Sequence, residues 1–208
     1  MIEESDIRLA ERLATGAGEI LLALQRNSGL EGKELGKAGD QQANAWLMKE
    51  LRCCRPDDAI LSEEETDNAE RLSATRVWII DPLDGTREYG EKRTDWAVHV
   101  ALSINYEASV GAVALPGLGL TLTSGNPAVL PPANNPPKML VSRTRPAKEA
   151  VEVAEAIGAE LLPMGSAGAT AMAVVRGEAD IYLHTGGQYQ WDNCAAVAVA
   201  LAYGLHCS

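Results

Sequence analysis

Two aspartates follow an apolar segment of the chain and could bind a metal ion. In "VWIIDPLDGT", residues 77–86, Asp81 comes directly after four apolar residues and Asp84 comes three residues later. The proline between them fixes φ, and Gly85 permits a tight bend, so the chain can bring Asp84 back beside Asp81. The carbonyl of Leu83 then faces the same space. Carboxylate and carbonyl oxygens are the ligands that Mg²⁺ prefers, so this segment predicts a small cation site.

Each candidate acid also has an ordinary structural interpretation. Asp84 and Gly85 form a pair that is common in hairpin turns. Glu63 lies in "SEEE", and consecutive acids are typical of a solvated surface. Asp40 and Asp192 each stand near the expected start of a helix, where aspartate often caps the first backbone N–H groups. Taken singly, these acids leave the choice between a metal site and plain structure open.

Four motifs taken together resemble a known family. They are "LSEE" (61–64), "WIIDPLDGT" (78–86), "GSAG" (165–168) and "WDNCAA" (191–196). In this order they are similar to the signatures of the inositol monophosphatase family, and within it most of all to the bacterial 3′(2′),5′-bisphosphate nucleotidases. The resemblance implies a layered α/β/α/β/α sandwich. It also implies a Mg²⁺-dependent phosphomonoesterase that converts 3′-phosphoadenosine 5′-phosphate into AMP and phosphate in sulfate assimilation. Fructose 1,6-bisphosphate and inositol 1-phosphate are the alternative substrates.

The same resemblance implies roles for individual residues. Two or three Mg²⁺ ions would be bound by a set of oxygen ligands from Glu63, Asp81, Leu83, Asp84 and Asp192. The proton of the attacking water would pass to Glu63 with Thr86, or to Asp40. The substrate-binding residues would be Glu63, Leu83, Gly85, Thr86, Gly165, Ser166, Ala167 and Asp192.

The chain departs from the family pattern at several places. Lys37 replaces the threonine of the family's T-x-A-D segment, which reads "KAGD" here. Thr170 stands where related nucleotidases often carry lysine. His99 lies on an alternating strand, and we interpret it as a packed or surface residue and not as a ligand. Family members continue for several tens of residues beyond the "WD" helix, so we expect the C-terminal part to be truncated.

Two other classes of protein share some of these features. Phosphatases of the haloacid dehalogenase type also have a strand that ends in D-x-D-G-T, and there the first aspartate becomes phosphorylated. Here two residues separate Asp81 from Asp84, which disfavours that class. A nucleotide-binding or sugar-phosphate-binding protein without turnover is the second alternative. Phosphate release that requires Mg²⁺ and is lost in Asp84→Asn would reject it.

The pattern of apolar residues predicts a mixed α and β fold of the α+β or α/β class. Apolar positions recur at helical spacing over residues 5–26, and a polar, glycine-rich loop then leads to a second helix from about residue 40 to 54. Antiparallel strands follow, and after a proline-rich segment strands alternate with helices. We therefore expect an N-terminal half with the metal motifs, a connecting loop and an incomplete C-terminal half, at 1–125, 126–137 and 138–208.

Composition limits the kinds of molecule that the chain is expected to bind and the compartment in which it is expected to work. Its 18 basic and 29 acidic residues give a net charge of −11, which argues against binding to a nucleic acid polymer. A small phosphorylated substrate remains compatible, because bound cations reverse the local field. No apolar run approaches the ~20 residues of a membrane span. Four cysteines without regular spacing indicate reduced thiols in the cytoplasm. By resemblance, a homodimer is an expected assembly.

Overall fold

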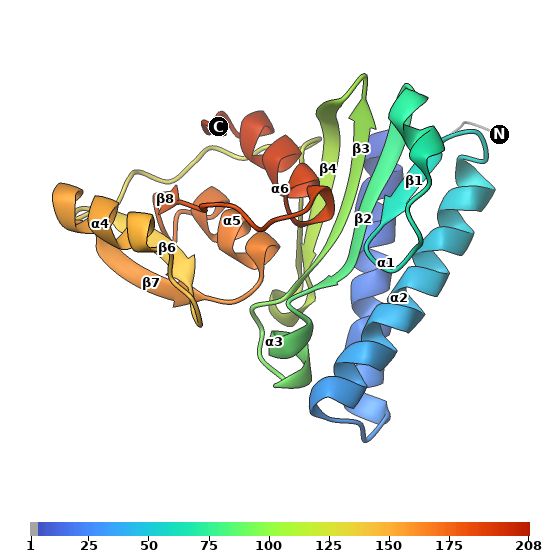
Figure 1. Ribbon diagram of the computed structural model, residues 1–208, viewed down its shortest axis with the longest axis horizontal. Helices are drawn as coiled ribbons and strands as arrows, with labels where there is room; N and C mark the ends of the chain where they lie inside the picture. Colours follow the sequence, from blue (N-terminus) through green and yellow to red (C-terminus); the bar gives the residue numbers. More distant parts are fainter. Residues whose placement is uncertain (1–3) are drawn as a thin grey trace.

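The computed structural model describes residues 4–208, in which two β-sheets alternate with layers of helices (Figure 1). The helices are α1 (Asp6–Asn27), α2 (Gly32–Cys54), α3 (Thr86–Gly90), α4 (Lys148–Ile157), α5 (Ala167–Val175) and α6 (Gln190–Ala202), with short 3₁₀ helices at Ala69–Ser73 and Pro116–Leu118. The strands are β1 (Ala59–Ser62), β2 (Arg76–Asp84), β3 (Ala97–Ile104), β4 (Glu107–Leu115), β5 (Leu120–Thr123), β6 (Lys138–Ser142), β7 (Glu160–Met164) and β8 (Ile181–Tyr182).

The larger sheet places the acidic motifs at one edge of its strands. Its order is β1-β2-β3-β4-β5, with β1 and β2 parallel and the other neighbours antiparallel. Within the β2–β3 pair, Asp81 lies opposite His99 and Asp84 lies opposite Ala97, so β2 uses one residue more than β3. Such a bulge bends a strand and redirects its side chains. Pro82 and Leu83 lie within the bulge, and the pairing of the two strands resumes at Asp84.

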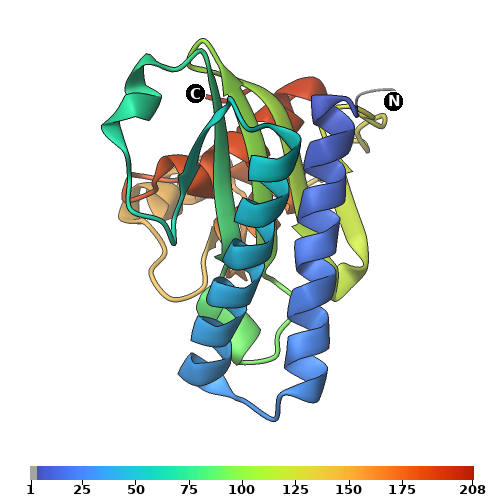
Figure 2. The same cartoon turned by 90° about the vertical axis from the view of Figure 1, so that its right-hand side faces the viewer.

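Helices cover both faces of this sheet. Figure 2 shows α1 and α2 side by side on one face, where Leu13 and Trp78 are fully buried in the same core. The opposite face packs against α5 and α6, with Met172 and Val199 in the second core. Gly111 on β4 permits the close approach of α6, since a Cβ there would collide with a backbone carbonyl of that helix. Burial of both faces fixes the end of β2 relative to the start of α6.

A second, all-parallel sheet of order β7-β6-β8 completes the layers. On one side Met139 packs with Ala150 and Ala154 of α4, and on the other Leu140 packs with Ala173 of α5. The succession is α1/α2, larger sheet, α5/α6, smaller sheet and α4, so the expected α/β/α/β/α sandwich is confirmed. The proline-rich stretch joins the two sheets. The division into two halves stays a prediction.

The second helix is longer than the sequence pattern predicts. Residues 32–39 of the expected glycine-rich loop are helical, because α2 starts at Gly32, and only residues 28–31 connect the two helices. The reason is tight packing on α3: a Cβ at Gly36 would lie 2.6 Å from Cγ2 of Thr86. The interpretation of Asp40 as a helix N-cap is therefore wrong, since Asp40 lies inside α2.

Among the described residues, none of the helices has the length and apolar character of a membrane span.

Candidate metal and phosphate site

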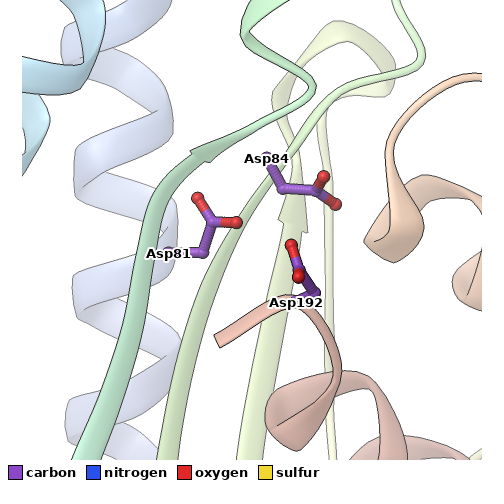
Figure 3. A group of neighbouring side chains, drawn as sticks. All are labelled: Asp81, Asp84 and Asp192. Carbon is purple, nitrogen blue, oxygen red and sulfur yellow. The ribbon is translucent and has the colours of Figure 1, made fainter. Parts of the chain in front are cut away.

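Three aspartates from two distant parts of the chain meet at the end of β2. In the part of the chain that the structure describes, Asp81, Asp84 and Asp192 each offer a carboxylate oxygen within 4.8 Å of the others. Figure 3 shows the first two on the strand and Asp192 at the start of α6, with all three carboxylates gathered around one space. Asp81 and Asp84 are buried, and Asp192 is partly exposed. The cluster is therefore largely buried, and Asp192 is its most exposed member.

The turn after β2 leads into a helix and not into a hairpin. Gly85 has φ of 87°, in the left-handed region that suits glycine, and α3 begins at the next residue. The hairpin-turn interpretation of Asp84 and Gly85 is therefore wrong. The hydroxyl of Thr86 turns back and donates a hydrogen bond to the carbonyl of Leu83 at 3.1 Å. Leu83 and Thr86 are thus held beside the aspartates.

Asp81 lies in an environment that disfavours its negative charge. It is 1% exposed, and its Oδ1 accepts a hydrogen bond from the backbone N–H of Leu83 at 3.0 Å. Burial raises the pKa of Asp81 well above its usual value, and the negative charges of Asp84, Glu63 and Asp192 raise it further. A cation among these carboxylates would remove that penalty. The donor set, all oxygen, suits a hard cation such as Mg²⁺.

Asp84 is held by four donors. His99 Nε2 lies 3.1 Å from Oδ2, and Ser166 Oγ donates to the same oxygen at 2.6 Å. The backbone N–H groups of Ala167 and Gly168 donate at 3.2 and 2.6 Å. Burial opposes ionisation, but the hydrogen bonds from His99, Ser166 and Gly168 outweigh it, so the pKa of Asp84 is lowered. The start of α5 is therefore hydrogen-bonded to Asp84, the last residue of β2.

These contacts change the interpretation of His99 and of residues 165–167. His99 is a packed residue as expected, with no exposed surface, but it also contacts Asp84, which its strand pattern did not reveal. Ser166 and Ala167, expected at the substrate, contact Asp84 here. Gly165 donates its N–H to Asp95 at 2.9 Å. A substrate role for residues 165–167 stays a prediction.

Asp192 both caps a helix and belongs to the carboxylate cluster. It lies in the first turn of α6, where its Oδ2 accepts a hydrogen bond from the N–H of Tyr189 at 2.6 Å. Burial raises the pKa of Asp192, the Tyr189 hydrogen bond opposes the rise, and the charge of Asp84 adds to it. Asp192 is not the N-cap that the sequence suggested, because Tyr189 holds that position. It stabilises the helix start from the third helical residue, and its other carboxylate oxygen remains for a cation.

Glu63 lies next to the three aspartates but outside their cluster. It follows β1, and its backbone N–H donates to the carbonyl of Ile80 at 3.2 Å, which places it beside the strand that carries Asp81. Partial removal from water raises the pKa of Glu63, a hydrogen bond with Asp81 opposes this, and Asp192 adds to the rise. The structure therefore brings four of the expected carboxylates to one edge of the sheet.

Asp40 approaches the site from α2, on the side of Thr86. It is 9% exposed, and among the described residues its Oδ1 has no hydrogen-bond partner. Burial raises the pKa of Asp40 to about 8, with contributions from the charges of Glu64 and Glu63, while a hydrogen bond with Thr86 acts in the opposite direction. At neutral pH and without metal, this carboxyl group is mostly protonated.

Comparison with known proteins identifies this arrangement. The model of the inositol monophosphatase family matches residues 3–207. The chain belongs to the inositol monophosphatase family. It is 46% identical to "3′-phosphoadenosine 5′-phosphate phosphatase" of Mycobacterium leprae, over 99% of this chain and 82% of the relative. It is 28% identical to "3′(2′),5′-bisphosphate nucleotidase CysQ" of Escherichia coli K12, over 81% of this chain and 74% of the relative.

Solved structures show the same fold. CysQ from Bacteroides thetaiotaomicron superposes with a TM-score of 0.77 at 23% identity, covering 94% of this chain and 85% of that one. Inositol monophosphatase from Anabaena superposes with a TM-score of 0.71, also at 23% identity, covering 95% and 81%. At this level of identity the likeness establishes the family fold.

Proposed function

We propose that this protein is a Mg²⁺-dependent phosphomonoesterase that hydrolyses 3′-phosphoadenosine 5′-phosphate to AMP and phosphate, as a step in sulfate assimilation. The cluster of Asp81, Asp84 and Asp192 carries the chemical part of the proposal, because it gathers three carboxylates whose oxygen atoms could bind a metal ion. The nucleotide substrate is supported by the 46% identity to a relative that bears that name.

The described residues fit magnesium. The ligands would be carboxylate and carbonyl oxygens, with two or three ions bound by Glu63, Asp81, Leu83, Asp84 and Asp192. The raised pKa of Asp81, caused by burial and by its acidic neighbours, indicates a negative site that lacks a counter-charge. Bound Mg²⁺ supplies positive charge that favours deprotonation of water and stabilises a leaving oxygen.

The chain's own residues would handle the proton and position the phosphate. Thr86 together with Glu63 accepts a proton in this scheme, and Asp40 is the alternative acceptor. The backbone N–H groups of Gly85 and Thr86, at the start of α3, hold phosphate oxygens. Residues 165–167, which border the metal motif through their contacts with Asp84, line the leaving-group side.

A phosphate-release panel tests this assignment. The full chain is assayed with Mg²⁺ on 3′-phosphoadenosine 5′-phosphate, fructose 1,6-bisphosphate and inositol 1-phosphate. We expect the highest kcat/KM for the nucleotide and no release with a chelator. Preference for either sugar phosphate would reject the nucleotide assignment within the family. Mg²⁺-dependent binding of the nucleotide without any phosphate release would indicate a binding protein.

Three further expectations accompany this function. The two halves, 1–125 and 138–208, would be separated by limited proteolysis within 126–137. The four cysteines are free, which supports a reducing compartment such as the cytoplasm. A homodimer is the assembly we expect from the family, and the mass of the protein in solution measures it.

A further inference from the structure

Ser166 has a backbone conformation that is unusual for its residue type. Its φ is 31° and its ψ is 126°, and a positive φ crowds any residue that carries a Cβ. Among the described residues, the other non-glycine residues with positive φ are Lys92, Asn105 and Tyr106, and all three lie in exposed turns. Ser166 is instead partly buried beside the carboxylate cluster. Strained backbone persists where surrounding contacts hold it, and it is often found at functional sites.

The strained turn supplies three of the four donors that hold Asp84. Ser166 Oγ donates to Oδ2 of Asp84 at 2.6 Å, and the N–H groups of Ala167 and Gly168 donate to the same carboxylate at 3.2 and 2.6 Å. Ser166 is also the N-cap of α5, because its Oγ accepts a hydrogen bond from the N–H of Ala169 at 3.0 Å. A change in φ at Ser166 would therefore move all three donors relative to Asp84.

Thr170 contacts this turn from inside α5. Its Oγ1 lies 2.8 Å from the carbonyl oxygen of Gly165 and 2.7 Å from that of Ser166. These carbonyls belong to the two peptide groups on either side of Ser166, so one hydroxyl holds both. A threonine that bonds the carbonyl four residues earlier is common in helices, but here that carbonyl belongs to a strained residue. Thr170 is 3% exposed, so water does not compete for its hydroxyl.

Other neighbours fix the position of the turn. The N–H of Gly165 donates to Oδ2 of Asp95 at 2.9 Å, and Asp95 is in turn bound by Arg93 at 2.6 and 2.8 Å. On the opposite side the turn packs on Gly85, where a Cβ would lie 3.0 Å from Cβ of Ser166. Thr170 thus completes a set of contacts that hold Ser166 between α5 and the end of β2.

We propose that Thr170 is a positioning residue for the metal site, whose hydroxyl holds Ser166 in the conformation that presents three donors to Asp84. The inference rests on the proposed Mg²⁺-dependent function and deepens it. The donors determine how the Asp84 carboxylate is oriented, and a metal ligand binds best when its orientation is fixed in advance. Substitution of groups that orient metal ligands typically changes metal affinity or activity by about 10- to 100-fold.

Three single substitutions in the full chain test this role. Thr170→Val keeps the shape of the side chain and removes the hydroxyl, whereas Thr170→Ser keeps the hydroxyl. The matched control is Thr123→Val, because Thr123 is also buried, at 7% exposure, and its Oγ1 accepts a hydrogen bond from the N–H of Gly125 at 3.0 Å, in the edge strand β5. Binding of Mg²⁺ alone is measured by isothermal titration calorimetry without substrate. The values of kcat and KM for 3′-phosphoadenosine 5′-phosphate are measured in parallel.

We expect Thr170→Val to weaken Mg²⁺ binding about tenfold and to lower kcat more than it raises KM. Thr170→Ser should bind Mg²⁺ within about twofold of the wild type, since the hydroxyl is what matters. Thr123→Val should bind Mg²⁺ like the wild type, although it also loses a buried hydroxyl. Equal Mg²⁺ affinity and equal kcat in Thr170→Val and Thr123→Val would overturn the proposal, and so would a failure of Thr170→Ser to restore binding.

A double substitution shows whether Thr170 acts through Ser166. Ser166→Gly removes the strain, because glycine adopts positive φ freely, and it also removes the hydroxyl that contacts Asp84. We expect Thr170→Val to weaken Mg²⁺ binding by less than about twofold when Ser166→Gly is already present, since coupled residues are not additive. A further loss of about tenfold would show that Thr170 acts elsewhere. A wild type that binds Mg²⁺ but releases no phosphate would reject the proposed function and not the role of Thr170.

Discussion

His99 tests how Asp84 is held in place. The ring is fully buried and its Nε2 lies 3.1 Å from Oδ2 of Asp84. His99→Leu keeps an apolar side chain but removes this contact. A hydrogen bond to a charged group contributes about 1.5–3 kcal/mol, and three donors remain on Asp84, so we expect a loss of about 2 kcal/mol in the free energy of unfolding. For a domain of this size that corresponds to a fall in Tm of about 4–8 °C.

Urea denaturation of the full chain with a chelator present measures this loss. His99→Gln is the matched variant, because its side-chain amide can donate to Asp84 from a similar position. We expect His99→Gln to recover at least half of the stability lost in His99→Leu. Equal stability of His99→Leu and the wild type would refute the reasoning. So would an equal loss in both variants, since packing alone would then explain the role of His99.

Three further substitutions test other parts of the structure. The pKa of Asp40 is about 8 in the folded protein and about 4 when unfolded, so its contribution to stability is complete below about pH 4 and is lost as pH rises to about 8. In metal-free buffer, Asp40→Asn should therefore gain stability relative to the wild type between pH 5 and 8; a constant difference in urea midpoints would contradict this. Gly111→Ala should push α6 from the sheet and cost about 1–3 kcal/mol in urea denaturation, and an unchanged midpoint would be the contrary result. Gly36→Ala should displace α2 from Thr86 and lower kcat more than it raises KM, whereas full activity would show that this packing is not needed.

The acids of the site could be predicted from the sequence because each of them lies at the end of a strand or the start of a helix, and such positions are visible in the pattern of neighbouring residues. Asp81 ends an apolar strand, and the residues that follow it can bend the chain tightly. Asp192 is predicted by its position at a helix start. The family resemblance added the information that these two distant segments meet, which neither motif contains alone.

The sequence could not predict contacts that depend on strand register and on packing. His99 lies opposite Asp81 because of the β2–β3 register, and a bulge then brings Asp84 within its reach. A lone histidine on an alternating strand carries no sign of this. The start of α2 was missed for a similar reason: glycines such as Gly36 favour loops in isolation, but here they permit close packing on α3.

Phosphate release from 3′-phosphoadenosine 5′-phosphate as a function of Mg²⁺ concentration tests the central claim most directly. The assay compares the wild type with Asp81→Asn and with Asp57→Asn, an exposed aspartate outside the carboxylate cluster. We predict release by the wild type and by Asp57→Asn only with Mg²⁺, and a loss of more than about a hundredfold in kcat/KM for Asp81→Asn. Release at the wild-type rate by Asp81→Asn, or by the wild type after chelation, would contradict the account.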